Sequence, residues 1–224
     1  MNGNKNMEEL WKEIKAEKTP GTIPVVEEFW GNFEYGDCVL EVGCGWGRII
    51  FQCLKRELEV VGIDVNKKSV EYLNEKIKNS SVSPNRVKIL NKSVLDTNFE
   101  DSSFDGVLMQ GLLSALKKDD RMKAIREISR ILKSGGVIHV GEFKFHEKFK
   151  ERYEKDYPKT GEYGTLSVTD DEGKEIFQSH NFEISELIEL LKEGGFENIE
   201  VIEKEIKTYH NNKKPGIMVI AENQ

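Results

Sequence analysis

The sequence predicts an α/β fold built on a doubly wound, mostly parallel seven-stranded sheet that ends in an antiparallel C-terminal hairpin. Three observations support this prediction. Short, nearly all-apolar runs alternate with segments of helical period, which is typical of a parallel sheet with helices on both faces. Three glycines follow the first apolar run closely. The last two apolar runs are joined by a short polar turn, which indicates a hairpin.

The alternation can be followed through most of the chain. The expected strands cover residues 39–42, 60–64, 86–90, 104–110 and 136–143. The expected helices between and after them cover residues 47–57, 67–79 and 119–133. A last helix over 184–194 precedes two strands over 199–209 and 216–222, with HNNKKP as the turn between them.

Two segments stand outside this alternation and suggest the domain organisation. We expect residues 1–35 to form an N-terminal helical lid segment and residues 36–224 to form the main domain. Within that domain, residues 144–183 show no clear period. Irregular stretches of this length in compact domains are usually functional lids or partly disordered segments. We therefore predict that residues 144–183 are an insertion on the substrate side.

The composition argues against several classes of function. A net charge of -7 disfavours binding of nucleic acid by bulk electrostatics. No apolar run is long enough to span a bilayer, and the N-terminal residues do not read as a cleavable leader. Cys38, Cys44 and Cys53 lack the spacing of a metal site or a disulfide framework. We expect a cytoplasmic protein that binds no metal, DNA or membrane.

The glycine-rich stretch VLEVGCGWGR predicts a ligand site. A turn between the first strand and the first helix lies at the carboxyl edge of the sheet, where open α/β folds bind ligands. Gly43, Gly45 and Gly47 would let a ligand approach the backbone. Their spacing is neither G-x-G-x-x-G nor that of a phosphate loop. A pyrophosphate group is therefore not the expected ligand.

Two acidic residues refine this prediction. Glu41 lies just before the first glycine, where it would repel a phosphate and suit a cationic group. Asp64 ends the second strand, where a carboxylate can accept hydrogen bonds from both hydroxyls of a ribose. An adenosine without phosphates that carries a positive group fits both acids, and S-adenosylmethionine is such a molecule.

The chain resembles the class I S-adenosylmethionine-dependent methyltransferases, over residues 36–143 by motif and elsewhere by element order. Four stretches carry the resemblance in the family order: VLEVGCGWGR, VVGIDVNKKSVEYL, SVLDTNFEDSSFDGVLMQGLL and EISRILKSGGVIHVGEF. The resemblance implies the Rossmann-like methyltransferase fold, S-adenosylmethionine as the cofactor and S-adenosylhomocysteine as its product.

The resemblance also implies which residues contact the cofactor. The amino-acid part would lie at the glycine turn, the ribose at the second strand, the adenine near the third strand and the methyl group near the fourth. The implied residues are Glu41, Gly43, Cys44, Gly45, Asp64, Val65, Val94, Leu95 and Gln110. Gly47 is interpreted as a helix-packing residue.

Catalytic residues are harder to predict, because the sulfonium is already activated and the protein mainly aligns the acceptor. A base is needed only if the acceptor must lose a proton. His146, Tyr163 and His180 of the insertion are the candidates. The aromatic residues of this segment could equally form a small satellite core.

We expect a methyltransferase that acts on a small molecule by in-line methyl transfer. At the end of the fourth strand the chain reads Met-Gln-Gly-Leu instead of the N/D-P-P-Y/F tetrad of amino-group methylases, and no Pro-Cys nucleophile is present. Two alternatives stay open: a methyltransferase acting on RNA or protein, and a non-catalytic cofactor-binding subunit. The sequence predicts no oligomeric state.

Overall fold

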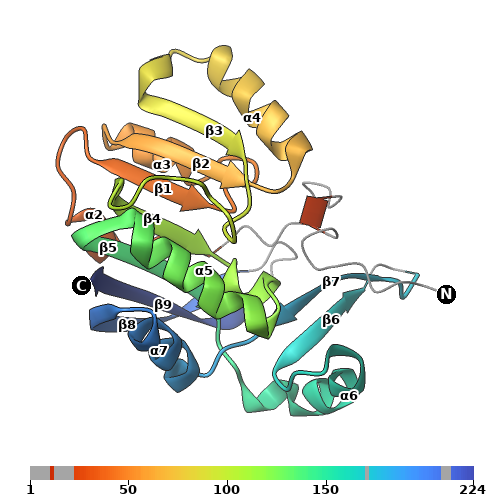
Figure 1. The fold of residues 1–224 in the computed structure, drawn as a ribbon. Helices are drawn as coiled ribbons and strands as arrows, with labels where there is room; N and C mark the ends of the chain where they lie inside the picture. Colours follow the sequence, from red (N-terminus) through yellow and green to blue (C-terminus); the bar gives the residue numbers. More distant parts are fainter. Residues whose placement is uncertain (1–10, 13–22, 170–171, 208–212) are drawn as a thin grey trace.

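The structure is a computed structural model, and it describes residues 11–12, 23–169, 172–207 and 213–224. A seven-stranded sheet has the order β3-β2-β1-β4-β5-β9-β8, and β6 and β7 form a separate ribbon (Figure 1). The strands of the large sheet are β1 (Cys38–Val42), β2 (Glu59–Asp64), β3 (Val87–Asn91), β4 (Phe104–Gln110), β5 (Leu132–Phe143), β8 (Phe196–Lys207) and β9 (Lys213–Asn223). The helices that accompany them are α2 (Glu27–Trp30), α3 (Ile50–Lys55), α4 (Lys67–Lys78), α5 (Lys118–Ile131) and α7 (Ile184–Glu193), with short 3-10 turns η2 (Pro84–Arg86) and η3 (Leu113–Ala115).

The strand pairing confirms the predicted fold class. Strands β1 to β5 are parallel to one another, whereas β9 is antiparallel to both β5 and β8. The chain enters at β1, winds outward to β3 and then crosses back to β4. The order therefore reverses between β1 and β4, and a ligand crevice is expected beside their carboxyl ends.

Two hydrophobic cores lie on the two faces of the sheet. One combines α5 and α7 with inward residues such as Val42, Met109 and Val140. The other combines α3, α4 and the segment around α2 with residues such as Val60 and Leu108. Both faces are covered, which explains why the parallel strands read as nearly continuous apolar runs.

The segment from residue 23 to residue 33 completes the second layer. Two glycines of the sheet leave room for this segment to pack. A Cβ on Gly106 would lie 2.4 Å from the ring of Phe33, and one on Gly141 would lie 2.6 Å from Cγ2 of Ile23. Of the predicted lid segment 1–35, residues 1–10 and 13–22 lie outside the described residues.

The structure corrects the expectation that residues 144–183 lack regular structure. They contain η4 (Glu147–Phe149), α6 (Lys150–Thr160), β6 (Thr165–Thr169) and β7 (Glu175–His180). The helical period of α6 could not be detected in the sequence, because α6 buries only Tyr153 and Asp156 and has no apolar stripe. The ribbon strands are short and carry several polar residues, so they resemble loop sequence.

The part of the chain that the structure describes contains no helix long and apolar enough to cross a membrane.

Candidate cofactor site

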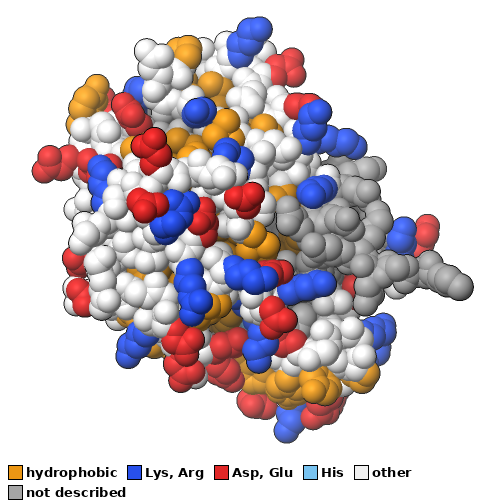
Figure 2. All heavy atoms as spheres, in the orientation of Figure 1, with side chains coloured by type: hydrophobic (Ala, Val, Ile, Leu, Met, Phe, Trp, Pro, Cys, Tyr) orange, Lys and Arg blue, Asp and Glu red, His pale blue; other side chains and the backbone are white. Residues whose placement is uncertain are grey.

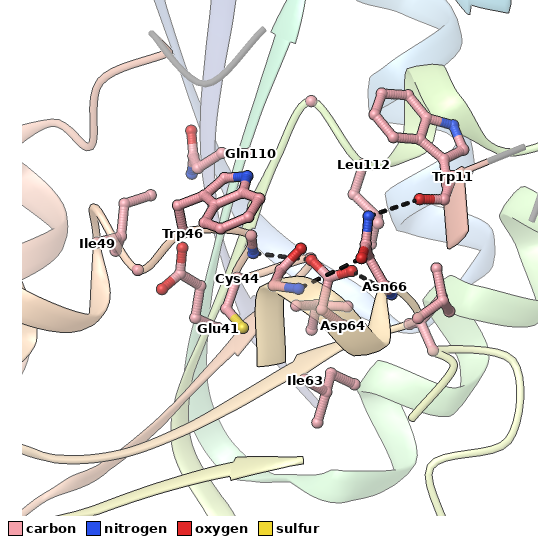
Figure 3. Close-up of a pocket in the computed structure, with 18 of the residues that line it drawn as sticks. Trp11, Glu41, Cys44, Trp46, Ile49, Ile63, Asp64, Asn66, Gln110 and Leu112 are labelled. Carbon is pink, nitrogen blue, oxygen red and sulfur yellow. Dashed lines mark hydrogen bonds between the residues drawn. The ribbon is translucent and has the colours of Figure 1, made fainter. Parts of the chain in front are cut away.

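A cavity of about 620 Å³ opens at the carboxyl ends of the central strands. Its walls are the loops that follow β1, β2, β3 and β4, together with Trp11 (Figure 3). Eight of the nine predicted cofactor residues line it: Glu41, Gly43, Cys44, Gly45, Asp64, Val65, Val94 and Gln110. Leu95, the ninth, is absent from the lining and packs against the core of the α5 face.

The glycine turn is held against the end of β2 by backbone hydrogen bonds. The N–H groups of Gly43 and Cys44 donate to the carbonyl of Ile63 at 2.8 and 3.0 Å. Gly45 has a φ of 49° and its N–H donates to Oδ2 of Asp64 at 2.7 Å. Positive φ strains residues that carry a side chain. The glycine at position 45 therefore allows the turn that brings this N–H within hydrogen-bond distance of Asp64.

Gly47 allows close packing of the turn, as predicted from the sequence. Its φ is 82°, and a Cβ there would lie 2.4 Å from Cδ1 of Leu73 in α4. The residue therefore allows the turn and α4 to approach each other closely. Because the turn continues through Gly47, helix α3 begins only at Ile50 instead of at residue 47.

Asp64 joins the two loops that border the cavity. Its Oδ1 accepts a hydrogen bond from the N–H of Asn66 at 2.8 Å, while Oδ2 accepts from Gly45. Burial raises the pKa of this carboxyl, and the two N–H groups oppose that rise. A carboxylate offers about four acceptor positions. Two donors occupy it here, so acceptor capacity is left for ligand hydroxyls.

Glu41 lines the cavity, and its carboxyl group lacks one hydrogen-bond partner among the described residues. The side chain is buried, and its Oε2 has no hydrogen-bond partner among the described residues. Burial raises the pKa of Glu41 well above its usual range, although the Arg48 guanidinium opposes this. Buried polar atoms are nearly always paired. A cationic ligand group would supply the missing partner, so the site fits the ammonium of an amino acid.

Gln110 is held by a histidine behind the cavity wall. Its terminal amide lies 2.6 Å from Nδ1 of His139, a wholly buried residue of β5. The other ring nitrogen, Nε2, accepts a hydrogen bond from the N–H of Val26 at 3.2 Å. Burial lowers the pKa of His139 to about 4, so the ring is neutral.

Several lining residues were missed from the sequence. Asn66 could have been found, because it follows Asp64 closely and caps α4 by accepting from the N–H groups of Lys68 and Ser69. Trp11 belongs to the predicted lid segment 1–35, but its contact with the cavity depends on tertiary packing. Its carbonyl accepts a hydrogen bond from the side chain of Asn66 at 3.1 Å. The other missed lining residues include Trp46, Arg48, Leu112, Ala115 and Leu116.

The three predicted catalytic residues do not line this cavity. His146 is exposed and caps η4 by accepting a hydrogen bond from the N–H of Lys148. Tyr163 is 45% exposed and contacts the rings of Phe145 and Tyr153. These contacts place the aromatic residues of the insertion in a cluster around Tyr153.

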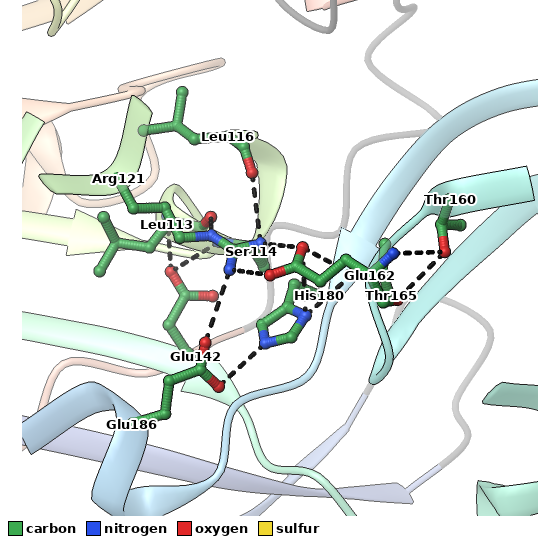
Figure 4. A network of polar contacts seen from close by, with 10 residues as sticks. All are labelled: Leu113, Ser114, Leu116, Arg121, Glu142, Thr160, Glu162, Thr165, His180 and Glu186. Atoms are coloured by element: carbon green, nitrogen blue, oxygen red, sulfur yellow. Dashed lines mark hydrogen bonds and ion pairs between the residues drawn. The ribbon is translucent and has the colours of Figure 1, made fainter. Parts of the chain in front are cut away.

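His180, the third candidate, lies in a buried polar network (Figure 4). Its Nδ1 lies 2.9 Å from Oγ1 of Thr165 and its Nε2 lies 3.0 Å from Oε2 of Glu186. Arg121 makes a bidentate ion pair with Glu162, at 2.6 and 2.8 Å. Burial raises the pKa of Glu162, but the hydrogen bonds and charge of Arg121 outweigh this effect, and the pKa is lowered overall.

The same network includes a cluster of acidic residues that pairs with Arg121. Glu162, His180 and Glu186 are close enough together to hold a metal. Arg121 already supplies the positive charge, and it also donates to the carbonyls of Leu113 and Leu116. The network therefore anchors the insertion to η3, which precedes α5.

Comparisons with known proteins agree with this geometry. A family model for a methyltransferase domain matches residues 39–136. A solved SAM-dependent methyltransferase from Methanosarcina mazei is 28% identical, with a TM-score of 0.84, and the match covers 90% of this chain and 99% of that one. Residues 39–136 are therefore identified as a methyltransferase domain of the class I S-adenosylmethionine-dependent type.

Relatives of this chain differ in what they modify. The 27-O-demethylrifamycin SV methyltransferase of Amycolatopsis mediterranei is 31% identical over 136 residues, which are 59% of this chain and 49% of that protein. The tRNA N(3)-cytidine methyltransferase of Mus musculus is 28% identical over 151 residues, which are 64% of this chain and 35% of that protein. The chain thus spans about half or less of the length of these two relatives.

S-adenosylmethionine is the cofactor of this family, and the residues present fit it. The unpartnered Oε2 of Glu41 suits its ammonium group, and Asp64 keeps acceptor capacity for its ribose hydroxyls.

Proposed function

We propose that this methyltransferase transfers the methyl group of S-adenosylmethionine to a small molecule by in-line displacement. The observation that carries the proposal is the pair of acids in one cavity, Glu41 at the end of β1 and Asp64 at the end of β2. Bound there, the cofactor supplies an activated methyl group. The protein binds it, orients it and excludes water.

The apolar wall after β4 supports an acceptor site beside the methyl group. Leu112, Ala115 and Leu116 follow Gln110 along the cavity. An apolar surface with few polar groups suits a small organic molecule, which it orients by shape. We therefore place the acceptor between this wall and Trp11.

Surface charge favours a small acceptor over tRNA. A nucleic-acid site needs unpaired cations that can neutralise phosphates. Several basic residues of α5 are paired with acids instead, among them Lys123 with Asp120, and Arg130 with Asp101 and Glu127. Figure 2 shows acidic and basic side chains interspersed over α5 and α7 on the face that it draws. The similarity to the tRNA enzyme makes tRNA the second candidate.

We also propose that residues 144–183 act on the substrate side. The described residues of this insertion do not line the cavity, and His146 or Tyr163 could reach an acceptor only if the insertion closed over it. Lids belong to the less stable parts of a fold because they must open and close. Hydrogen exchange should be faster here than in β1 and β4, and should slow with cofactor and acceptor together. Equal protection with and without both ligands would contradict the lid.

A radiolabelled methyl group tests the activity and the acceptor class together. The protein is incubated with labelled S-adenosylmethionine and either a protein-free small-molecule extract or purified total tRNA. The expected result is label in the small-molecule fraction, and none with Asp64→Ala. Label in the tRNA alone would contradict the acceptor class. Label in neither fraction would favour a non-catalytic cofactor-binding protein.

A further inference from the structure

The contacts of His139 determine which of its nitrogens carries the proton. The N–H of Val26 is a peptide donor and points at Nε2, 3.2 Å away. Nε2 must therefore keep its lone pair, which excludes the charged ring as well as the Nε2–H form. The proton of the neutral ring is consequently on Nδ1.

This protonation state fixes the direction of the Gln110 amide. Nδ1–H is a donor, so the group that faces it at 2.6 Å must be an acceptor. An amide offers one acceptor, its oxygen, and a half-turn about its last bond exchanges oxygen and nitrogen. The oxygen of Gln110 therefore faces His139, and its NH₂ group is turned away from the ring.

The outer end of this amide lacks a partner. It lies over Gly141, where a Cβ would come within 2.1 Å of it, and it has no hydrogen-bond partner among the described residues. Gln110 belongs to the cavity wall. A buried NH₂ group without an acceptor is costly, and an oxygen atom of a bound ligand would satisfy it.

The same short segment holds a second donor at the cavity. The guanidinium of Arg48, another lining residue, donates to the carbonyl of Ile23. Residues 23–26 thus position Arg48 directly and Gln110 through His139. With Glu41 available for an ammonium group, these two donors suit the carboxylate of the same amino acid.

We propose that His139 is a positioning residue that fixes Gln110 as a hydrogen-bond donor to the carboxylate of the cofactor. This proposal rests on the proposed function, because it assumes that the cavity holds the amino-acid part of S-adenosylmethionine. Its first test needs no ligand. Nitrogen NMR of the free, uniformly labelled protein should show a pyrrole-type Nδ1 and a pyridine-type Nε2 for His139, assigned by loss of the signals in His139→Asn. A pyridine-type Nδ1 or a charged ring would overturn the proposal.

Two substitutions separate positioning from stability. In His139→Asn the amide nitrogen takes the place of Nδ1 and keeps the donor to Gln110. In His139→Gln the amide reaches the place of Nε2 and keeps only the contact to Val26. Calorimetry with S-adenosylhomocysteine should show near-normal affinity for His139→Asn, and about tenfold weaker binding for His139→Gln and Gln110→Leu, as for a lost hydrogen bond to a charged group.

A second ligand identifies the group that Gln110 contacts. The compound 5′-methylthioadenosine lacks the amino-acid part, so its affinity should be the same in the wild-type protein, His139→Gln and Gln110→Leu. Equal losses for both ligands would overturn the carboxylate assignment. Equal affinities of the two His139 variants for S-adenosylhomocysteine would overturn the positioning role. A wild-type protein that binds neither ligand, but shows the expected tautomer, would instead contradict the proposed function.

Discussion

The indole ring of Trp11 lies against the ring of Phe177, with centroids 4.9 Å apart and an angle of 38° between the rings. Phe177 belongs to β7 of the ribbon, whereas Trp11 lines the cavity and accepts a hydrogen bond from Asn66. Asn66 in turn donates its N–H to Asp64. This chain of contacts connects the insertion to the loop that is expected to bind the ribose.

Phe177→Ala should therefore speed the release of S-adenosylhomocysteine. Loss of the ring partner frees Trp11 at the cavity wall, and lost ring contacts of this kind are worth about 0.5–1.5 kcal/mol. We expect a roughly two- to tenfold faster dissociation rate in stopped-flow measurements of tryptophan fluorescence. Tyr157→Ala, an exposed aromatic of α6 that contacts Tyr163, is the matched control. If both variants release the ligand at the wild-type rate, the ribbon is not connected to the site.

Gly47→Ala should destabilise the fold by about 2–4 kcal/mol, because positive φ and a clash with Leu73 add together. Gly161→Ala provides the control. Its φ is 71°, but a Cβ there meets nothing within 4 Å, so only the backbone strain of about 1–2 kcal/mol is expected. Urea unfolding measures both. A loss no greater for Gly47→Ala than for Gly161→Ala would show that α4 shifts without cost.

Glu142 should make stability depend on pH. Burial raises the pKa of this carboxyl to about 7, even though its Oε1 accepts from the N–H groups of Leu113 and Ser114. Between the unfolded pKa near 4.5 and the folded value, the folded state binds more protons, so rising pH destabilises it. From pH 5 to pH 8, Glu142→Gln should gain on the order of 3 kcal/mol relative to the wild type. Unfolding curves at both pH values test this, and a constant difference would contradict it.

Gly141→Ala should reduce the binding free energy of S-adenosylhomocysteine by more than it reduces the free energy of unfolding. The new Cβ would lie 2.1 Å from the end of the Gln110 amide and must displace it. Gly106→Ala is the matched control on the neighbouring strand. Its Cβ would clash with Phe33, which is not a cavity residue. Calorimetry should show about tenfold weaker binding for Gly141→Ala only; equal affinities would argue against a ligand contact by Gln110.

The parts predicted well from the sequence depend on local pattern. Asp64 and Glu41 were predicted to lie at one site because Asp64 ends β2 and Glu41 lies next to the end of β1, and both line the cavity. The terminal hairpin was found from its polar turn. Leu95 was predicted by its position after β3, but it is absent from the cavity lining and its partly buried side chain packs against the core.

The parts that were missed depend on contacts between distant segments. Trp11 contacts Asn66 and Phe177, which are both distant from it in the sequence, and no spacing in the sequence indicates either contact. The burial of Tyr153 under Phe145 likewise comes from tertiary packing, since α6 has no apolar stripe. The hydrogen bond between Val26 and His139 also joins distant segments, and no pattern in the sequence indicates it.

The central claim, that this cavity binds the cofactor with its ribose on Asp64, is tested most directly by calorimetry with S-adenosylhomocysteine. The matched control is Asp105→Ala, because Asp105 also accepts a hydrogen bond from a peptide N–H, that of Cys38, but lies outside the cavity. The account predicts binding by the wild-type protein and Asp105→Ala, and at least tenfold weaker binding by Asp64→Ala. No binding by the folded wild-type protein, or equal affinity of folded Asp64→Ala, would contradict it.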